Sequence, residues 1–177
     1  LASYNRALQI DSKKAAAWSG ITESYTAMKD YANATIAAAK ATELSNKNKD
    51  YWLREGNLLQ TQEMYQEAVT KYEGALTVDP VYKDALYKKG VMLMALGNYA
   101  EATKQFDLAL ESDPKFKQAY VAKGVILQAN GKYVEAQQAY DKALELDPVF
   151  GTALAYKMHV LLALKKPEEA MKIFVKI

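Results

Sequence analysis

The chain has 177 residues, of which half are hydrophobic and a quarter are charged, so its composition predicts a folded chain with a sizeable core. The 23 basic and 21 acidic residues leave a net charge of +2 and are interspersed, which argues against a nucleic-acid-binding surface. The sequence has one histidine and no cysteine, which excludes a disulfide framework, thiol nucleophiles and thiolate metal sites, and it has no apolar run long enough to cross a bilayer.

The sequence repeats with a period of 34 residues from one end to the other. The stretch GNYAEATKQFDLALESDP begins at Gly97 and returns as GKYVEAQQAYDKALELDP at Gly131, with 10 of the 18 places identical. The same offset brings one alanine of every repeat into register: Ala34, Ala68, Ala102, Ala136 and Ala170. A fixed period of this length is typical of solenoid proteins, in which each unit completes its core by packing on its neighbours.

Counted from Ala15, the period divides the chain into the ranges 1–14, 15–48, 49–82, 83–116, 117–150 and 151–177. The first range is expected to be the second helix of a truncated earlier repeat, and the last repeat is expected to be incomplete. Within each repeat, apolar residues at helical spacing form two blocks, which predicts two helices. Glycines such as Gly97 end the first helix, and Asp-Pro pairs such as Asp113-Pro114 end the second.

The first full repeat departs from the pattern of the others. Thr22 replaces a glycine, Ala38 replaces an aromatic residue, and Ser45-Asn46 replace Asp-Pro. We therefore expect a looser joint after this repeat, so that the N-terminal third opens first. In the last repeat Pro167 replaces a turn tyrosine and should still begin a helix, because proline suits the first turn.

The repeat resembles the tetratricopeptide repeat, an antiparallel helix pair of 34 residues. The resemblance rests on a glycine in the first helix, a tyrosine at the turn and an aromatic residue in the second helix: Gly56, Gly90 and Gly124; Tyr65, Tyr99 and Tyr133; Tyr72, Phe106, Tyr140 and Phe174. It implies an all-α, right-handed superhelical solenoid of antiparallel helix pairs. In this family the first helices line a concave groove that holds a peptide or a helix of a partner.

The resemblance also implies which side chains face the groove. The expected binding residues are Arg54, Asn57, Tyr87, Lys88, Val91, Met94, Val121, Val125, Tyr156 and His159. Two interpretations of the apolar members stay open. They form an exposed floor for a ligand, or they are partly buried between neighbouring first helices. Upstream, Glu23, Asp50 and Gln60 make the expected groove polar.

Lys89, Lys123 and Lys157 share the seventh place of their repeats. One interpretation is a row of ammonium groups that binds anions, an anion rail. We expect instead that their aliphatic carbons cover apolar surface, while the ammonium groups reach water or a neighbouring carboxylate. Some family members hold C-terminal carboxylates of chaperone peptides in a clamp of lysine and asparagine. The corresponding places here do not assemble that clamp, which disfavours chaperone-tail binding.

We therefore expect a non-catalytic protein-interaction scaffold in the cytoplasm, with a protein or peptide ligand and with no cofactor, metal, nucleic acid or membrane partner. One alternative is the regulatory or substrate-recruiting arm of a larger enzyme, such as a glycosyltransferase. Another, disfavoured by the period and the charge, is an RNA-binding helical repeat. End-to-end self-association is also expected, through apolar residues at the two ends: Tyr4, Ala7, Leu8, Phe174 and Ile177.

Overall fold

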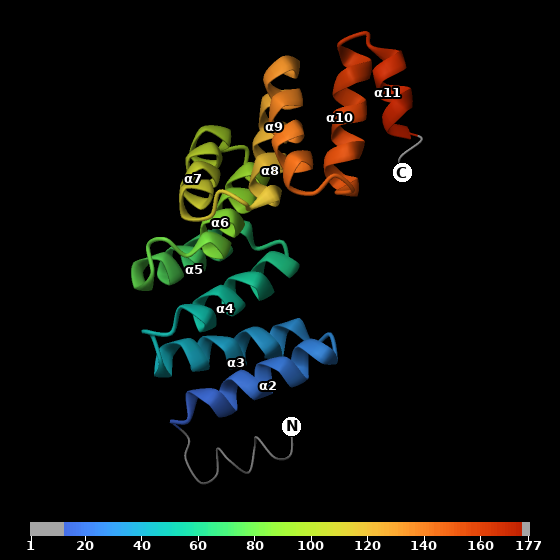
Figure 1. Cartoon of the computed structure of the whole chain (residues 1–177). Helices are drawn as coiled ribbons and strands as arrows, with labels where there is room; N and C mark the ends of the chain where they lie inside the picture. The colour runs from blue at the N-terminus through green and yellow to red at the C-terminus, as the bar shows by residue number, and fades with distance from the viewer. Residues whose placement is uncertain (1–12, 175–177) are drawn as a thin grey trace. The chain divides into compact units, whose positions relative to one another are not determined.

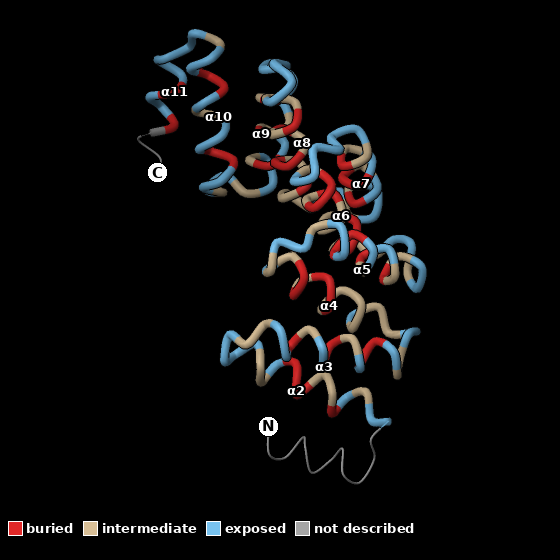
Figure 2. Tube along the Cα trace, turned by 180° about the vertical axis from the view of Figure 1, so that it is seen from behind, coloured by how far each residue is buried: buried red, intermediate tan, exposed pale blue. Residues whose placement is uncertain are grey.

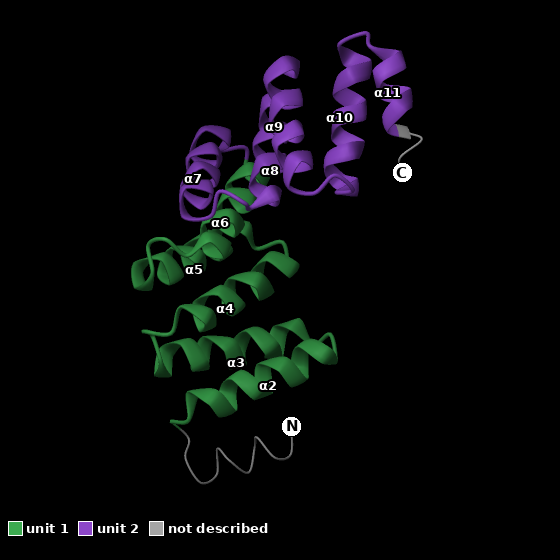
Figure 3. Ribbon diagram, viewed as in Figure 1, with its two compact units in different colours: residues 1–96 green, residues 97–177 purple. Residues whose placement is uncertain are grey.

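The computed structural model describes residues 13–174, and all regular secondary structure among them is α-helical (Figure 1). The predicted all-α fold is confirmed. The chain divides into two compact units, Leu1–Leu96 and Gly97–Ile177 (Figure 3). The boundary between the units falls inside the repeat predicted at 83–116.

The described helices of unit 1 are α2 (Ala15–Ala27), α3 (Tyr31–Leu44), α4 (Lys49–Thr61), α5 (Tyr65–Val78) and α6 (Lys83–Ala95). Those of unit 2 are α7 (Tyr99–Ser112), α8 (Lys117–Ala129), α9 (Tyr133–Leu146), α10 (Gly151–Ala163) and α11 (Pro167–Phe174). Consecutive helices pack together within each unit, most extensively in the pairs α2 with α3, α4 with α5 and α8 with α9. The first helix of every repeat begins at the residue from which the period was counted. As predicted, Pro167 begins a helix.

Burial follows the helix pairs, with buried stretches in the helices of both units and exposed turns between them (Figure 2). Glycine on the first helix is a steric requirement of this packing. A Cβ atom on Gly56 would lie 2.5 Å from the ring of Tyr72, and one on Gly124 would lie 2.4 Å from the ring of Tyr140. These distances are shorter than any normal carbon contact, so the aromatic residue of α5 or α9 fits only over a glycine.

The first repeat keeps its core closed by a paired exchange. Thr22 stands at the place of Gly56 and Ala38 at the place of Tyr72, and both residues are buried. A larger residue on α2 thus accompanies a smaller one on α3, which offsets part of the lost ring volume. The looser joint expected after this repeat stays a prediction.

A different contact fastens the ends of the repeats 49–82 and 117–150. Lys49 Nζ lies 2.5 Å from Asp79 Oδ2 and 4.3 Å from the ring centre of Tyr82. The hydrogen bond from Lys49 holds the pKa of Asp79 below its ordinary value. Lys117 makes the same pair of contacts with Asp147 and the ring of Phe150.

The first repeat lacks this junction, because Ala15 and Ser45 occupy the places of the lysine and the aspartate. Instead, the Asn48 side chain accepts a 3.0 Å hydrogen bond from the Asp50 backbone N–H and caps α4. Trp52 Nε1 donates to the Asn46 backbone carbonyl at 2.8 Å. The turn before α4 is therefore held by an asparagine cap and a tryptophan rather than by an ion pair.

The row of lysines at the seventh place joins neighbouring repeats. Lys89 Nζ lies 3.0 Å from Glu73 Oε1 in unit 1, and in unit 2 Lys157 pairs with Asp141 at 2.6 Å. Lys123 pairs in the same way with Asp107. Each ammonium group is thus neutralised by a carboxylate of the preceding second helix. This confirms the expected packing role and makes the anion rail wrong.

The expected contacts at the two ends fall largely on residues that the structure does not describe. Tyr4, Ala7, Leu8 and Ile177 lie outside the described residues, as do the side chain of Phe174 and most of the range 1–14. The expected self-association through these residues therefore stays a prediction.

Candidate functional site

A hollow of about 440 Å³ lies between the first helices α2 and α4 of unit 1, and we call it the α2/α4 groove. Its lining residues are Glu23, Thr26, Ala27, Tyr31, Arg54, Asn57, Leu58 and Thr61. Two of the predicted binding residues, Arg54 and Asn57, are among them. The volume lies in the range of small-ligand sites, roughly 300–1,000 Å³.

An ion pair crosses this groove. Arg54 Nη1 lies 2.5 Å from Glu23 Oε1, and the two side chains remain 37% and 60% exposed. Water competes for both charges at such exposure, so the pair contributes at most about 1 kcal/mol to folding. Both groups are therefore accessible to a partner. The exposed Ala27 supplies apolar surface beside them, whereas Leu58 is 5% exposed and belongs to the core cluster of Ala34 and Ala38.

A hydrogen-bonded network continues from the groove along α4. The ring of Tyr72 is fully buried, and its hydroxyl lies 3.0 Å from Asn57 Oδ1 and 3.1 Å from Gln60 Oε1. Lys88 Nζ of α6 lies 3.4 Å from the same Gln60 oxygen. Burial raises the pKa of Tyr72, so its hydroxyl stays protonated and can donate to one amide oxygen at a time.

Lys88 differs from the lysines at the repeat junctions. It is half-buried, but the structure gives it no carboxylate partner among residues 13–174, and its recorded hydrogen bond goes to the neutral amide of Gln60. A second link comes from Tyr82, the residue before α6, whose hydroxyl donates to Asp50 Oδ1 at 2.9 Å. These two bonds connect α4 with α6 and its N-terminal cap.

The predicted apolar residues of unit 1 lie on α6. Tyr87, Val91 and Met94 are all half-buried. Burial also raises the pKa of the Tyr87 hydroxyl. Each side chain thus keeps part of its surface exposed and buries the remainder. The interpretation as a ligand floor and the interpretation as partly buried packing therefore both apply in part.

In unit 2 the predicted residues divide between core and surface. Val121 is 6% exposed and belongs to the core cluster of Tyr140 and Val160, because α10 covers it. Val125 is half-buried against the same cluster. We therefore leave Val121 out of the proposed contact surface. Sequence spacing placed it on the groove face of α8 and did not reveal that α10 would close over it.

Tyr156 and His159 of α10 are exposed. Tyr156 stacks on Tyr140 with ring centres 5.7 Å apart and an angle of 14° between the planes. The Tyr140 hydroxyl lies 3.0 Å from Gln128 Oε1, so unit 2 repeats the tyrosine–amide contact of unit 1. The sequence prediction assigned Tyr72 and Tyr140 to packing alone. The signal in the sequence that could have revealed the tyrosine–amide contact is tyrosine, rather than phenylalanine, at the aromatic position of these two second helices.

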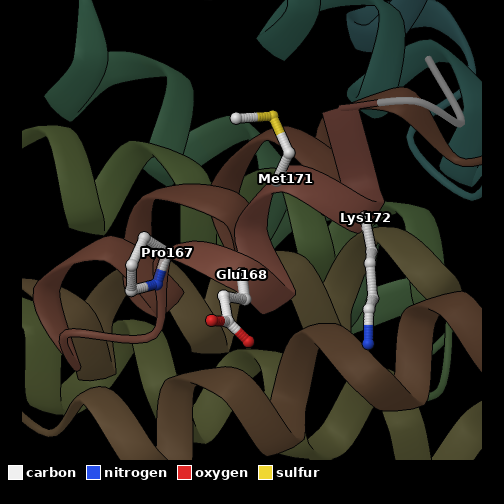
Figure 4. Close-up of a pocket in the computed structure, with 4 residues that line it drawn as sticks. All are labelled: Pro167, Glu168, Met171 and Lys172. Atoms are coloured by element: carbon white, nitrogen blue, oxygen red, sulfur yellow. The ribbon is translucent and has the colours of Figure 1, made fainter.

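A second hollow lies on α11 and is lined by Pro167, Glu168, Met171 and Lys172 (Figure 4). All four residues come from one helix, and Met171 is 64% exposed. None of them was predicted as a binding residue. The hollow joins no two helices, unlike the α2/α4 groove.

Residues 13–174 hold no cluster of three or more histidine, cysteine, aspartate or glutamate side chains that could bind a metal ion. No described helix is both long and apolar enough to cross a membrane.

Comparison with known families decides what kind of repeat this is. One tetratricopeptide repeat profile matches residues 53–116 and another matches residues 118–150, so together they cover more than half of the chain. The chain belongs to the tetratricopeptide repeat family. The family predicted from the glycine, tyrosine and alanine register is thereby confirmed. Among curated proteins the search found no significant match.

Several solved structures share the fold of this tetratricopeptide repeat chain. MamA from Desulfovibrio magneticus RS-1, residues 41 to the end, is 20% identical over 92% of each chain, with a TM-score of 0.82. YrrB, described as a TPR protein with an unusual peptide-binding site, is 22% identical over 98% of this chain and 89% of its own, with a TM-score of 0.75. PilW, described as a widely conserved type IV pilus biogenesis factor, is 21% identical over 97% and 80%, with a TM-score of 0.83. At these identities the likeness establishes the fold alone.

Proposed function

We propose that this chain is a non-catalytic protein-interaction scaffold that binds a peptide or a helix of a partner protein on its first helices. The observation that carries the proposal is the α2/α4 groove, where the exposed charges of Arg54 and Glu23 stand beside an amide, Asn57, and the exposed Ala27. Membership of the tetratricopeptide repeat family supports it. So does the fold shared with YrrB, whose description names a peptide-binding site.

The charges in unit 1 indicate what kind of partner would bind. Arg54 is held by an exposed glutamate, and Lys88 has no carboxylate partner among residues 13–174. A carboxylate of the partner can replace Glu23 at the guanidinium group, because charge-assisted hydrogen bonds to arginine are stronger than neutral ones. An apolar side chain beside that carboxylate would rest on the exposed Ala27. The proposed ligand is therefore a segment that carries an acidic residue next to an apolar one.

The proposal is tested with one groove variant and one matched control. The probe is the tightest binder selected on the wild-type chain from a display library of random linear peptides. Arg54→Gln should weaken its affinity about tenfold, the value of one charge-assisted hydrogen bond. The control is Lys104→Gln on the second helix α7, where Lys104 pairs with Glu101 at 3.1 Å on the exposed surface. Equal affinities of Arg54→Gln and wild type would place the binding surface elsewhere.

Two further parts of the proposal concern the setting of the protein. A cytoplasmic location is proposed, and fractionation of the source cells checks it.

Self-association is proposed as well, and the exposed Met171 on α11 supports an apolar contact there. Sedimentation velocity over a wide concentration range should show species larger than the monomer, and a strictly monomeric protein at high concentration would contradict this part.

A further inference from the structure

The residue type at the aromatic position of the second helix varies together with the residue type at one position on the first helix of the same repeat. Tyrosine occurs with glutamine, as in Tyr72 with Gln60 and Tyr140 with Gln128. Phenylalanine occurs with an apolar residue, and these pairs are Phe106 with Met94 and Phe174 with Leu162. The hydroxyl group is thus present in the two repeats that also carry the amide.

The packing of the ring does not require this hydroxyl. The rings of Tyr72 and Phe106 are both fully buried, so the core accepts either residue. What the hydroxyl adds is a hydrogen bond to an amide of the first helix, at 3.0–3.1 Å from α5 to α4 and at 3.0 Å from α9 to α8. Because the ring is clamped over Gly56 or Gly124, the hydroxyl holds a fixed position.

The amides that receive these bonds are fixed but not saturated. Asn57, Gln60 and Gln128 are half-buried, and their NH₂ groups have no hydrogen-bond partner among the described residues. The oxygens of Asn57 and Gln128 each have a second lone pair that can accept a further bond, whereas Gln60 Oε1 already faces both the Tyr72 hydroxyl and Lys88 Nζ. A side-chain amide can therefore donate to the C=O of a peptide unit and accept from its N–H at the same time.

This chemistry distinguishes between the two kinds of ligand left open above. In a bound helix the main-chain N–H and C=O groups are used internally, except at the ends of the helix. In an extended peptide these groups are free to bond to the surface. We propose that Tyr72 is a positioning residue of unit 1 that orients the amides of Asn57 and Gln60 to bind the main chain of an extended partner peptide. The inference rests on the proposed function and deepens it.

The test removes single hydroxyl groups and keeps the rings. Tyr72→Phe should weaken binding of the selected linear peptide about fivefold, the typical value of a hydrogen bond. The matched control is Tyr65→Phe, which removes a hydroxyl at the first residue of the same helix α5. This control should bind as the wild type does.

Two readouts separate positioning from a purely structural role. Ester bonds replace single peptide bonds in the probe, which removes an N–H and weakens the carbonyl acceptor. The ester at the contacting position should lose its effect in Tyr72→Phe, because both changes then remove the same interaction. In nuclear magnetic resonance spectra of the free protein, Tyr72→Phe should shift the side-chain NH₂ signals of Asn57 and Gln60 while the backbone signals of α2 stay in place.

The inference and the proposed function can fail separately. If Arg54→Gln weakens binding but Tyr72→Phe binds as the wild type does, the scaffold stands and the positioning role is wrong. The inference is also overturned if a side-chain-bridged helical form of the probe binds more tightly than the linear form. If Arg54→Gln has no effect, the proposed function itself fails.

Discussion

At the residue scale, one backbone position recurs in every repeat. The residue that follows the C-cap of each first helix has a positive φ: Lys29 (59°), Glu63 (60°), Gly97 (80°), Gly131 (73°) and Lys165 (59°). Glycine adopts this left-handed conformation without strain, whereas a residue with a Cβ atom pays roughly 1–2 kcal/mol. The sequence predicted a helix end at Gly97 and Gly131, and the structure requires the same conformation of Lys29, Glu63 and Lys165.

Glu63→Gly should therefore raise the free energy of unfolding by roughly 0.5–1 kcal/mol, after the greater flexibility of unfolded glycine is subtracted. The reverse change, Gly131→Lys, should lower it by a similar amount. A Cβ atom on Gly131 would meet no atom within 4 Å, so the effect comes from the backbone alone. Urea unfolding of both variants measures the two values. The two changes in the free energy of unfolding must have opposite signs, and a stabilising Gly131→Lys would contradict the account.

Val121 carries the second prediction at this scale. An aspartate in its place would be buried beside Tyr140 and Val160 without a counter-charge, so Val121→Asp should cost several kcal/mol of stability. Tyr156→Asp is the comparison, because Tyr156 is 37% exposed and an aspartate there can reach water. Thermal unfolding should separate the two variants clearly. Similar melting temperatures would mean that Val121 lies on the surface after all.

At the scale of the element, helix pairs differ in what they bury. The buried apolar residues of α3 are all alanines, whereas α5 buries Val69 and Tyr72 as well as alanine. The pair α2/α3 also lacks the lysine–aspartate junction that closes α4/α5. The alanines of α3 bury less apolar area, which supports the prediction from the sequence that the first repeat opens first.

Hydrogen exchange tests this order inside unit 1. The amides of α2 and α3 should lose protection before those of α4 and α5, since local opening follows the number of buried apolar contacts. Both pairs belong to one compact unit, so solvent and temperature act on them equally. Uniform protection of the four helices, or earlier exchange of α4 and α5, would refute the expected order.

At the scale of the whole molecule, the sequence predicted the fold better than the site. The period placed the starts of α4, α6 and α8 at Lys49, Lys83 and Lys117, because stacked repeats must present the same apolar face at the same interval. It could not predict that a hydroxyl from α5 would reach two amides of α4. That contact depends on how deeply the ring sits over glycine, which no spacing rule records. The pairing of Arg54 with Glu23 across two helices was equally hidden.

The central claim is that a partner segment binds along the first helices. Nuclear magnetic resonance of the labelled chain, titrated with the selected linear peptide, tests this claim most directly. The account predicts that the largest signal changes occur at Arg54, Asn57, Gln60 and Lys88, with little change on α7 and α9. Changes confined to second-helix residues such as Lys104 and Lys142, with the first-helix signals unmoved, would contradict it.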